Sequence, residues 1–288
     1  MSRRTAAGQL VRGQADAPPL AVAGRPRRVV PMVLGYEPIP EAISLEGGSG
    51  FRYLLEPVTA AAIVFDEGWI LVDGGFAPAL RALTRGGGPF EYENYLPIVP
   101  TVDPLREQIA VAGLALDGLA ALLLTHAHFD HTGGARLLER HQPLLLQRRE
   151  WEYVLGVEDE RAAFVFADDL VRPGLGIVLL DGDAVVAPGL RVIDTAGHTP
   201  GHQSIVVELA EGTIVLAGDA ADLRTNIDRR VATGATAGED GPSAARRAIA
   251  LLADLDERPG TTVWPAHDPD WSPWRAAVDA QPVDRPGR

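Results

Sequence analysis

Histidine and aspartate are concentrated in one short stretch of the chain, Leu122-Leu-Leu-Thr-His126-Ala-His128-Phe-Asp130-His131-Thr-Gly-Gly134. His126 and His128 are two residues apart, so in extended backbone their side chains point to the same side and can bind one metal ion. Asp130 and His131 follow where the chain turns toward a helix, so they could face a second ion. Imidazole suits zinc, and a carboxylate also tolerates iron, manganese or cobalt. Because the chain has only seven histidines, this spacing predicts a metal site rather than an ordinary polar loop.

Three later stretches place a histidine or an aspartate just past an apolar run. They carry His198 in the sequence GHTPGH, Asp219 in GDA, and His267 in PAHD. Residues just beyond strand ends lie along one rim of a sheet, where functional sites are commonly assembled. Two ions with a shared carboxylate and a shared water would use all seven candidate ligands, which are His126, His128, Asp130, His131, His198, Asp219 and His267.

The apolar runs that should position these residues predict many short strands and a few helices. Two of the strand pairs turn at a Glu-Gly pair and are expected to form hairpins. Such a pattern fits two sheets packed together with helices outside. The expected strands are 28–34, 51–55, 58–65, 69–72, 116–124, 143–146, 177–180, 184–187, 190–193, 203–209, 213–217 and 261–264. The expected helices are 78–84, 104–112, 135–141, 148–155 and 242–255, with a helix or lid beside the site at 158–170.

The two ends of the chain differ in composition from the middle. Residues 1–27 hold five arginines among Ala, Gly, Pro and Gln without periodicity, and Arg28 follows directly, so we expect a flexible N-terminal arm or an arm packed on a partner subunit. Residues 281–288 are expected to form a C-terminal tail, which leaves 28–280 as a single domain. The N-terminus lacks the sustained apolar core of a secretory signal, and we expect a cytoplasmic protein.

Composition excludes several classes of function. The chain has no cysteine, which excludes disulfides, thiolate ligands and a thiol nucleophile. The formal net charge of -13 argues against a polyanionic substrate, because nucleic-acid-binding proteins usually present a basic face. No apolar run approaches the roughly 18 residues that a membrane span needs. We therefore expect no nucleic-acid or membrane partner, and we leave a homodimer open.

The four-part order THxHxDHxGG, GHTPGH, GDA and a late histidine resembles the metallo-β-lactamase superfamily over about residues 28 to 275. The resemblance implies an α+β fold, the metallo-β-lactamase-like four-layer αββα sandwich. It also implies two Zn²⁺ as cofactors, with other divalent metals such as Fe, Mn or Co as alternatives. The implied ligands are His126, His128 and His198 for the first metal and Asp130, His131 and His267 for the second, with Asp219 bridging.

Within that superfamily, three features resemble the N-acyl homoserine lactonase branch. They are Tyr95-Leu-Pro-Ile with Asp103-Pro-Leu, the spelling HFDHTGG, and GHTPGHQS. This resemblance implies a dinuclear, quorum-quenching hydrolase that opens a lactone ring by attack of a metal-bridging hydroxide. Its substrate would be a small-molecule lactone or ester, and Asp130 or Asp219 would pass a proton to the leaving oxygen.

One position departs from the pattern of those lactonases. They often carry a tyrosine three residues after the bridging aspartate, where it polarises the lactone carbonyl, and this chain has Asp222 there. An ionised carboxylate cannot donate a hydrogen bond to a developing oxyanion. Either the second metal acts alone, or Tyr36, Tyr95 or Arg224 supplies the donor, or the substrate differs.

Other activities remain as alternatives to this hypothesis. A thioester hydrolase of the glyoxalase II type uses the same seven ligands, although it normally adds basic residues for glutathione, and no Lys/Arg cluster is evident near the late motifs. A lactonase acting on another small lactone is a second alternative. A β-lactamase generally lacks the bridging aspartate, and a nuclease is disfavoured by the charge. A non-catalytic, metal-stabilised binding module is the alternative from another class.

Several further residues have two interpretations. Asp73 is predicted to orient a ligand histidine, and His202 to stabilise its turn or support a ligand. His141 is interpreted as a structural residue at a helix end. The aromatic residues near the motifs could wall an acyl pocket or pack in the core, and they are Trp151, Phe164, Phe166 and Trp271.

Overall fold

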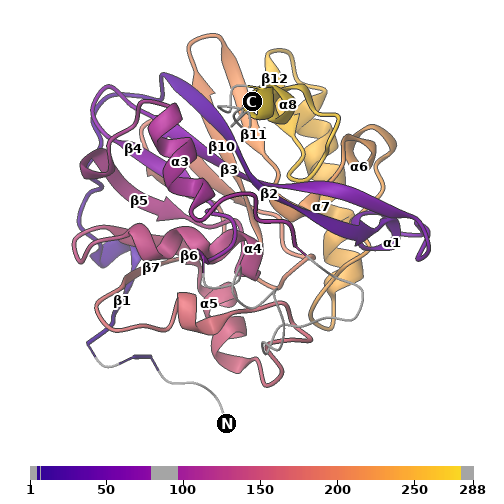
Figure 1. Ribbon diagram of the computed structural model, residues 1–288, viewed down its shortest axis with the longest axis horizontal. Coiled ribbons are helices and arrows are strands. Elements are labelled where there is room, and N and C mark those ends of the chain that lie inside the picture. The colour runs from indigo at the N-terminus through magenta and orange to yellow at the C-terminus, as the bar shows by residue number, and fades with distance from the viewer. Residues whose placement is uncertain (1–4, 7, 79–96, 280–288) are drawn as a thin grey trace, which may run out of the picture.

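Two β-sheets form the centre of the computed structural model, which describes residues 5–6, 8–78 and 97–279 (Figure 1). Within these residues the first sheet has seven strands, in the spatial order β1-β7-β6-β5-β4-β3-β2. The second sheet has five strands, in the order β12-β11-β10-β9-β8. The strands of the first sheet are β1 (Leu10–Gly13), β2 (Arg28–Pro40), β3 (Tyr53–Val64), β4 (Trp69–Val72), β5 (Leu119–Leu123), β6 (Pro143–Gln147) and β7 (Gly176–Leu180).

The later part of the chain supplies the second sheet and the longest of the described helices. The strands of this sheet are β8 (Ala184–Ala187), β9 (Leu190–Asp194), β10 (Gln203–Leu209), β11 (Gly212–Leu216) and β12 (Thr261–Trp264). The α-helices are α1 (Glu41–Ser44), α3 (Pro104–Val111), α4 (Phe129–Thr132), α5 (Arg148–Gly156), α6 (Arg224–Arg229), α7 (Gly241–Asp256) and α8 (Ser272–Asp279).

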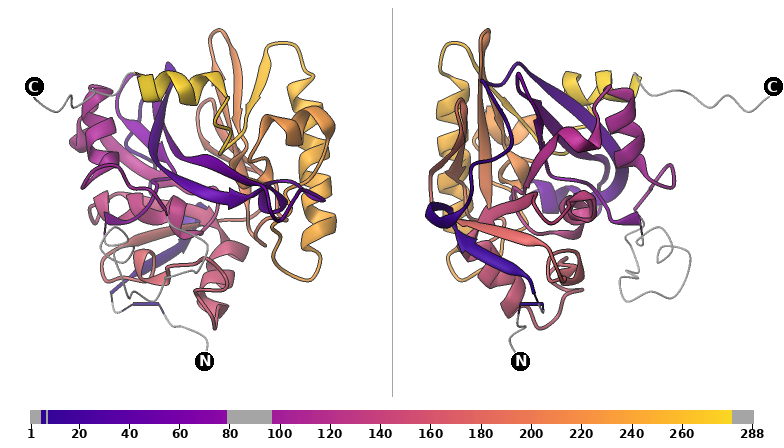
Figure 2. Two further views of the ribbon diagram at one scale, coloured as in Figure 1. Left: turned by 45° about the vertical axis from the view of Figure 1, so that its right-hand side comes forward. Right: turned by 90° about the vertical axis from the view of Figure 1, so that its left-hand side faces the viewer.

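Three buried apolar clusters show how these elements are layered. The first cluster contains Leu122 and joins the first sheet to α3 and α5. A second cluster lies between the sheets and joins Ile63 of β3 to Ile205 of β10. In the third, Val215 of β11 packs against Ile249 of α7. The layers therefore run helix, sheet, sheet, helix (Figure 2), which confirms the predicted four-layer αββα sandwich.

The parallel strands bring the ends of distant segments to one edge of each sheet. In the first sheet β4, β5, β6 and β7 run parallel, so their carboxyl ends meet at the same edge. The chain leaves β4 at Asp73, β5 just before His126, and β6 at the start of α5. In the second sheet β11 and β12 are parallel and lead to Asp219 and His267. The prediction that the chemistry-bearing residues follow strand ends is confirmed.

The predicted hairpins are confirmed, and one of their strands is longer than expected. β3 pairs with β4 across the turn at Gly68, and β10 pairs with β11 across the turn at Gly212. The strands predicted at 51–55 and 58–65 are instead one strand, β3, which runs through Pro57. Here β3 pairs with β2 but not yet with β4, so the missing N–H of the proline faces no partner strand.

Two helix predictions need correction. In place of the predicted helix at 135–141 the chain forms a 3-10 helix, Gly133–Leu137. A run this short depends on tertiary packing rather than on its own helix propensity, so its pattern alone did not fix its conformation. Residues 158–170 form turns and one short 3-10 helix, Ala167–Asp169, rather than an α-helix. This stretch does lie beside the predicted site, because Val165 forms a β-bridge with His128.

The prediction of a flexible N-terminal arm is wrong for Leu10–Gly13. These residues form β1, which pairs in parallel with β7 at the edge of the first sheet. Further along, Ala23 forms an antiparallel bridge with Glu67. Composition alone missed this strand because its four residues gain their stability from the neighbouring strand rather than from their own pattern.

Some predictions fall outside the described residues. They concern Tyr95, the C-terminal tail at 281–288 and the short helix expected at 78–84. Of that helix, only residue 78 is described. The division into an arm, one domain and a tail stays a prediction. Among the described residues, no helix combines the length and the apolar character needed to cross a bilayer.

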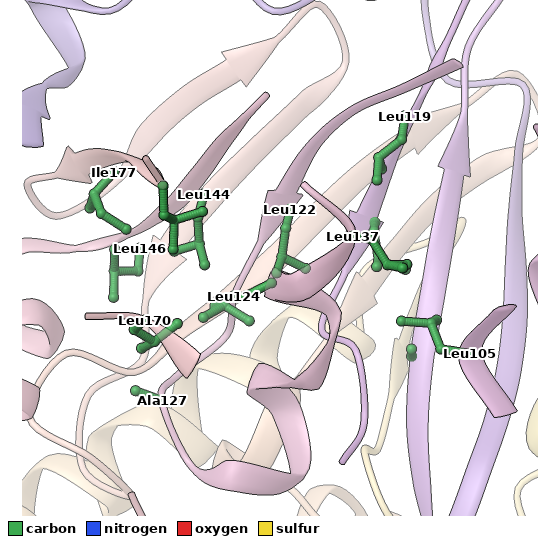
Figure 3. Packing of buried hydrophobic residues seen from close by; sticks show 14 of the residues in the cluster. Leu105, Leu119, Leu122, Leu124, Ala127, Leu137, Leu144, Leu146, Leu170 and Ile177 are labelled. Carbon is green, nitrogen blue, oxygen red and sulfur yellow. The ribbon is translucent and has the colours of Figure 1, made fainter. Parts of the chain in front are cut away.

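The first apolar cluster generates a stability prediction. Leu122 is fully buried at its centre, among Leu124, Leu137 and Leu144 (Figure 3). Replacing it with alanine should lower the free energy of unfolding by about 2–5 kcal/mol, because the cavity cannot collapse completely. The measurement is denaturant unfolding of Leu122→Ala beside Leu10→Ala, whose side chain is 55% exposed. Leu10→Ala should change stability by less than about 0.5 kcal/mol; equal effects would contradict this packing.

Candidate metal centre

The structure brings all seven predicted ligand residues together in two adjoining groups. Each group has four members, and its ligand atoms lie within 4.8 Å of one another. Six of the seven residues are buried and His128 is half-buried. The first group is His126, His128, His198 and Asp219; the second is Asp130, His131, Asp219 and His267.

Four segments of the chain deliver these side chains from the strand ends. His126 and His128 follow β5, and the first turn of α4 carries the next two members of the motif. His198 lies in the tight turn between β9 and β10. Asp219 is in the 3-10 helix directly after β11, and His267 follows β12. The site therefore lies where both sheets end, and no single loop could form it.

Asp219 lies between the two groups and faces both. Its Oδ2 atom is 3.3 Å from His198 Nε2 and 3.7 Å from His126 Nε2. Its Oδ1 atom is 3.0 Å from His267 Nε2 and 3.3 Å from His131 Nε2. The two carboxylate oxygens thus serve different groups, as a bridging carboxylate requires.

The outward-facing nitrogens of three histidines are fixed by hydrogen bonds. His198 Nδ1 is 3.0 Å from the carbonyl oxygen of Ala235, and His267 Nδ1 is 2.9 Å from that of Pro57. His131 Nδ1 is 2.9 Å from Asp73 Oδ2. A carbonyl or carboxylate oxygen can only accept, so each Nδ1 carries a proton, and Nε2 is the nitrogen of each ring that faces the cluster.

Asp73 connects two of the candidate ligand histidines, and these contacts agree with its predicted orienting role. Besides His131, it accepts hydrogen bonds from the backbone N–H of Thr125 at 2.8 Å and from the Thr125 hydroxyl at 2.9 Å. The same hydroxyl oxygen is 3.0 Å from His126 Nδ1 and accepts a hydrogen bond from its N–H. One buried carboxylate therefore sets the orientation of a histidine in each group.

Two glycines allow the loop after β4 to approach the main motif. A Cβ atom added to Gly74 would lie 2.3 Å from the backbone of Gly134, so any larger residue at position 74 would push the loops apart. This close contact explains why Asp73 can reach both Thr125 and His131.

The cluster perturbs the titration of its own members. Burial raises the pKa of Asp219, but the imidazoles of His267 and His131 lower it more, and the net pKa lies well below the usual range. Burial, with His198 nearby, lowers the pKa of His128 to about 3, and burial also holds the pKa of His126 well below its usual value. At neutral pH these groups are a carboxylate and neutral imidazoles, which are the forms that bind metals.

The second group behaves differently because its histidines adjoin more carboxylates. Burial lowers the pKa of His131, but Asp130 and Asp219 raise it more, so that the net pKa lies well above the usual value. Burial likewise lowers the pKa of His267, and Asp219 reverses the effect. A cation is therefore favoured at these nitrogens, and a proton and a metal ion would compete for them.

The donor set fits divalent metal ions. The Nε2 atoms of His126 and His131 are buried and make no hydrogen bond of acceptable geometry with the described residues. His128 Nδ1 and His198 Nε2 face each other at 2.9 Å, an arrangement expected of two nitrogens that share a ligand. Imidazole nitrogens and carboxylate oxygens converging in this way are typical of zinc sites.

A cavity of about 370 Å³ opens onto the two groups. His128, Asp130, His198 and Asp219 contribute to its lining, and Phe164 forms part of its wall. The remaining lining residues include an apolar set that sequence reasoning missed, because a strand-end motif gives no signal for a wall built by a distant hairpin. This set is Pro38, Ile39, Pro40, Ile43 and Tyr53, all from β2, α1 and the start of β3.

The other three aromatic residues considered for an acyl pocket do not line this cavity. Trp151 is buried in the first apolar cluster, and Phe166 packs against a separate small cluster. Trp271 lies 5.6 Å below the guanidinium of Arg224. For these three residues the packing interpretation is correct.

The position that departs from the lactonase pattern is buried outside the cavity lining. Asp222 is 3% exposed, and burial together with the charge of Asp219 raises its pKa well above the usual range. Among its proposed substitutes, Tyr36 lines a different cavity and Arg224 is paired with Asp256. Among the residues that the structure describes, Tyr53 is the one tyrosine that lines the cavity.

His202 belongs to neither group, as predicted. Its Nδ1 atom is 2.9 Å from the hydroxyl of Thr195, and that hydroxyl also contacts Ser204 at 2.8 Å. The histidine thus links the two ends of the turn that carries His198.

Comparison with known proteins identifies a family and several relatives. The profile described as Metallo-beta-lactamase superfamily matches residues 54–288. The chain is 30% identical over 215 residues to N-acyl homoserine lactonase AiiA of Bacillus thuringiensis subsp. kurstaki, covering 74% of this chain and 81% of that protein. It is 28% identical over 243 residues to N-acyl homoserine lactonase AttM of Azorhizobium caulinodans, covering 82% of this chain and 90% of the relative.

A solved structure is also similar over most of the chain. It is an N-acyl homoserine lactone hydrolase with the product N-hexanoyl-L-homoserine bound at its catalytic metal centre. The TM-score is 0.73 and the sequence identity 26%, and the match covers 85% of this chain and 94% of the other.

The contacts of Asp73 generate a prediction about metal binding. In Asp73→Asn one carboxylate oxygen becomes an NH₂ group, which cannot accept a hydrogen bond. Either the bond from the Thr125 backbone N–H to Oδ1 is lost, or the bonds from His131 and the Thr125 hydroxyl to Oδ2 are lost. Metal affinity should fall about 10- to 100-fold, as is usual when the partner of a ligand histidine is removed. The measurement is the zinc content of protein equilibrated with limiting zinc. Asp117→Asn, at an exposed position, is the control and should keep its zinc; unchanged zinc content in both variants would contradict the assigned role.

Proposed function

Because the chain belongs to the metallo-β-lactamase superfamily and is a metal-dependent hydrolase, we propose that it opens the ring of lactones, with N-acyl homoserine lactones as its substrate class. Two curated relatives are N-acyl homoserine lactonases. The similar solved structure holds the product of such a reaction at its metal centre. These similarities support the substrate class, and the cavity of this chain supports it independently.

The observation that carries the proposal is the composition of the cavity. At one end it offers His128, Asp130, His198 and Asp219, and along its wall it offers apolar side chains from β2 and α1. An N-acyl homoserine lactone is divided in the same way as the cavity, with a small polar ring at one end and an apolar acyl chain at the other. Burying such a chain against the wall contributes about 25 cal/mol per Å² of apolar surface.

The proposed cofactors are two zinc ions. His126, His128 and His198 would hold one, Asp130, His131 and His267 would hold the other, and Asp219 would contact both. Ions bound there supply Lewis acidity, which polarises a carbonyl oxygen and lowers the pKa of water toward neutrality.

The carboxylates have different proposed roles in moving protons. Both oxygens of Asp219 are engaged by histidines of the two groups, so Asp219 mainly holds the site together. Asp130 belongs to one group only and lines the cavity. Burial raises the pKa of Asp130, but His131 lowers it more, and the net pKa is below its usual value. Asp130 therefore stays ionised until it takes a proton from the attacking water, and it can pass that proton to the leaving oxygen of the opened ring.

The apolar wall would hold the acyl chain and keep water away from it. Phe164 contributes to this wall and stacks on Phe129 with 6.0 Å between ring centroids. The backbone N–H of Phe129 donates to the carbonyl of Phe164 at 2.9 Å. The wall is thus connected to the residue that precedes Asp130. The acyl chain and the lactone ring of the substrate can therefore be positioned together.

The direct test measures the hydrolysis of a panel of substrates as proton release in a pH-stat. The panel holds N-acyl homoserine lactones of several chain lengths, simple γ-lactones and S-lactoylglutathione, with zinc-replete protein. We expect rapid proton release from the acyl homoserine lactones, because they fill both ends of the cavity. Turnover of the thioester alone would contradict the proposal and support the glyoxalase II alternative. Lack of turnover on the whole panel by protein that binds zinc would contradict it as well.

Phe164 provides a prediction about chain length. Replacing it with alanine removes apolar surface from the cavity wall and should raise KM for long-chain substrates about tenfold, which corresponds to roughly 1.4 kcal/mol of lost burial. Short-chain substrates should change little. Steady-state kinetics of Phe164→Ala are compared with those of Phe51→Ala, whose side chain is 98% exposed and lies outside the cavity lining. An equal loss at all chain lengths would contradict a role in holding the chain.

A further inference from the structure

Glu150 is a buried carboxylate that belongs to neither metal group. It lies in the first turn of α5, two residues after the helix begins, and its side chain is completely buried. Carboxylates are rarely buried without strong partners, because removing a charge from water is costly. The partners of Glu150 are therefore informative about its role.

The carboxylate joins two loops that both carry ligand histidines. Glu150 Oε1 accepts a hydrogen bond from the backbone N–H of Ala127 at 2.9 Å. Glu150 Oε2 accepts one from the backbone N–H of Gly201, also at 2.9 Å. Ala127 lies between His126 and His128, and Gly201 lies in the turn that carries His198.

The turn that carries His198 packs directly on the backbone of α5. A Cβ atom added to Gly201 would lie 2.2 Å from the backbone nitrogen of Glu150 and 2.6 Å from its Cα. Only glycine fits at this distance. The N-terminus of α5 therefore contacts this turn through its backbone as well as through the Glu150 side chain.

We infer that Glu150 is a positioning residue for the first metal group, holding His126, His128 and His198 at the separation that one metal ion requires. The inference rests on the proposed metal centre. A carboxylate suits this role because both of its oxygens accept hydrogen bonds, and the two backbone groups that they face are both N–H donors. The three histidines lie on two loops that are more than 60 residues apart in sequence, and Glu150 is a side chain that contacts both.

Other residues make different links between the same elements. Gln203 donates from Nε2 to the carbonyl of Leu124 at 2.7 Å and accepts from Gln147 at 2.9 Å. These bonds join β10 to the ends of β5 and β6, before the ligand-bearing residues begin. Glu150 acts further along, at the residues adjacent to the ligands, so its removal should affect the metal site more than the sheets.

The substitution that tests this role is Glu150→Gln. Glutamine has nearly the same shape, but its NH₂ group would face one of the two N–H donors, so one contact must break. We expect the affinity of the folded protein for zinc to fall about 10- to 100-fold. Glu152→Gln is the matched control, because it makes the same change on the same helix at an exposed position. It should bind zinc as the unmodified chain does.

The measurement is competition for zinc against a chromophoric chelator, with folding followed by circular dichroism and thermal unfolding of the zinc-free proteins. A residue with only a structural role would lower the unfolding temperature without changing zinc affinity. Weakened zinc binding by folded Glu150→Gln, with normal binding by Glu152→Gln, supports the inference. Unchanged zinc affinity in folded Glu150→Gln overturns it while leaving the metal centre intact.

Two further outcomes are also decisive. If the unmodified chain binds no zinc, both the metal centre and the role of Glu150 are overturned. If Glu150→Gln does not fold, Glu150→Asp replaces it, because the shorter side chain keeps the charge but cannot reach both N–H groups. Weakened zinc binding by folded Glu150→Asp supports the inference, and normal binding overturns it. Failure of both variants to fold, with zinc present, also overturns it, since Glu150 would then support the fold rather than the site.

Discussion

Hydrogen bonds from backbone N–H groups to two buried carboxylates, Asp73 and Glu150, fix the loops on which the candidate metal ligands lie. Both carboxylates follow the carboxyl ends of parallel strands that flank β5, the strand that delivers the main motif. The order of strands in the first sheet therefore places one acceptor on each side of that motif. Loops that pack only by apolar contact would have more freedom, because apolar contacts are not directional.

Charge compensation is the second constraint on the site. Asp130 and Asp219 are buried close to each other, to His131 and to His267, and Asp219 also adjoins the three histidines of the first group. Buried carboxylates are costly unless they are paired or bind cations. In our account the metal ions provide that compensation, and the pKa of Asp219, held well below its usual range by the surrounding imidazoles, shows how strongly this position favours positive charge nearby.

The sequence was most informative where local pattern and chemistry coincide. The seven candidate ligands could be found because each follows an apolar run and belongs to a residue type that binds metals. The layered fold followed from a resemblance carried by those same motifs, and the structure confirms it. The metal-binding role of the seven side chains is a proposal that their geometry supports.

The features that the sequence did not predict depend on contacts between distant segments. The strand Leu10–Gly13 gains its partner from β7, more than 160 residues later. The apolar wall depends on where the hairpin of β2 and β3 lies relative to the metal groups, which no local pattern encodes. Glu150 could not be distinguished from an ordinary first-turn glutamate, a common residue at helix starts, until its partners on two other loops were known.

The most direct measurement of the central claim is anomalous diffraction at the zinc absorption edge from crystals of the zinc-loaded protein. We expect two peaks, one surrounded by His126, His128 and His198 and the other by Asp130, His131 and His267, with Asp219 between them. A single peak, peaks elsewhere, or no peak at these seven side chains would contradict a dinuclear metal centre.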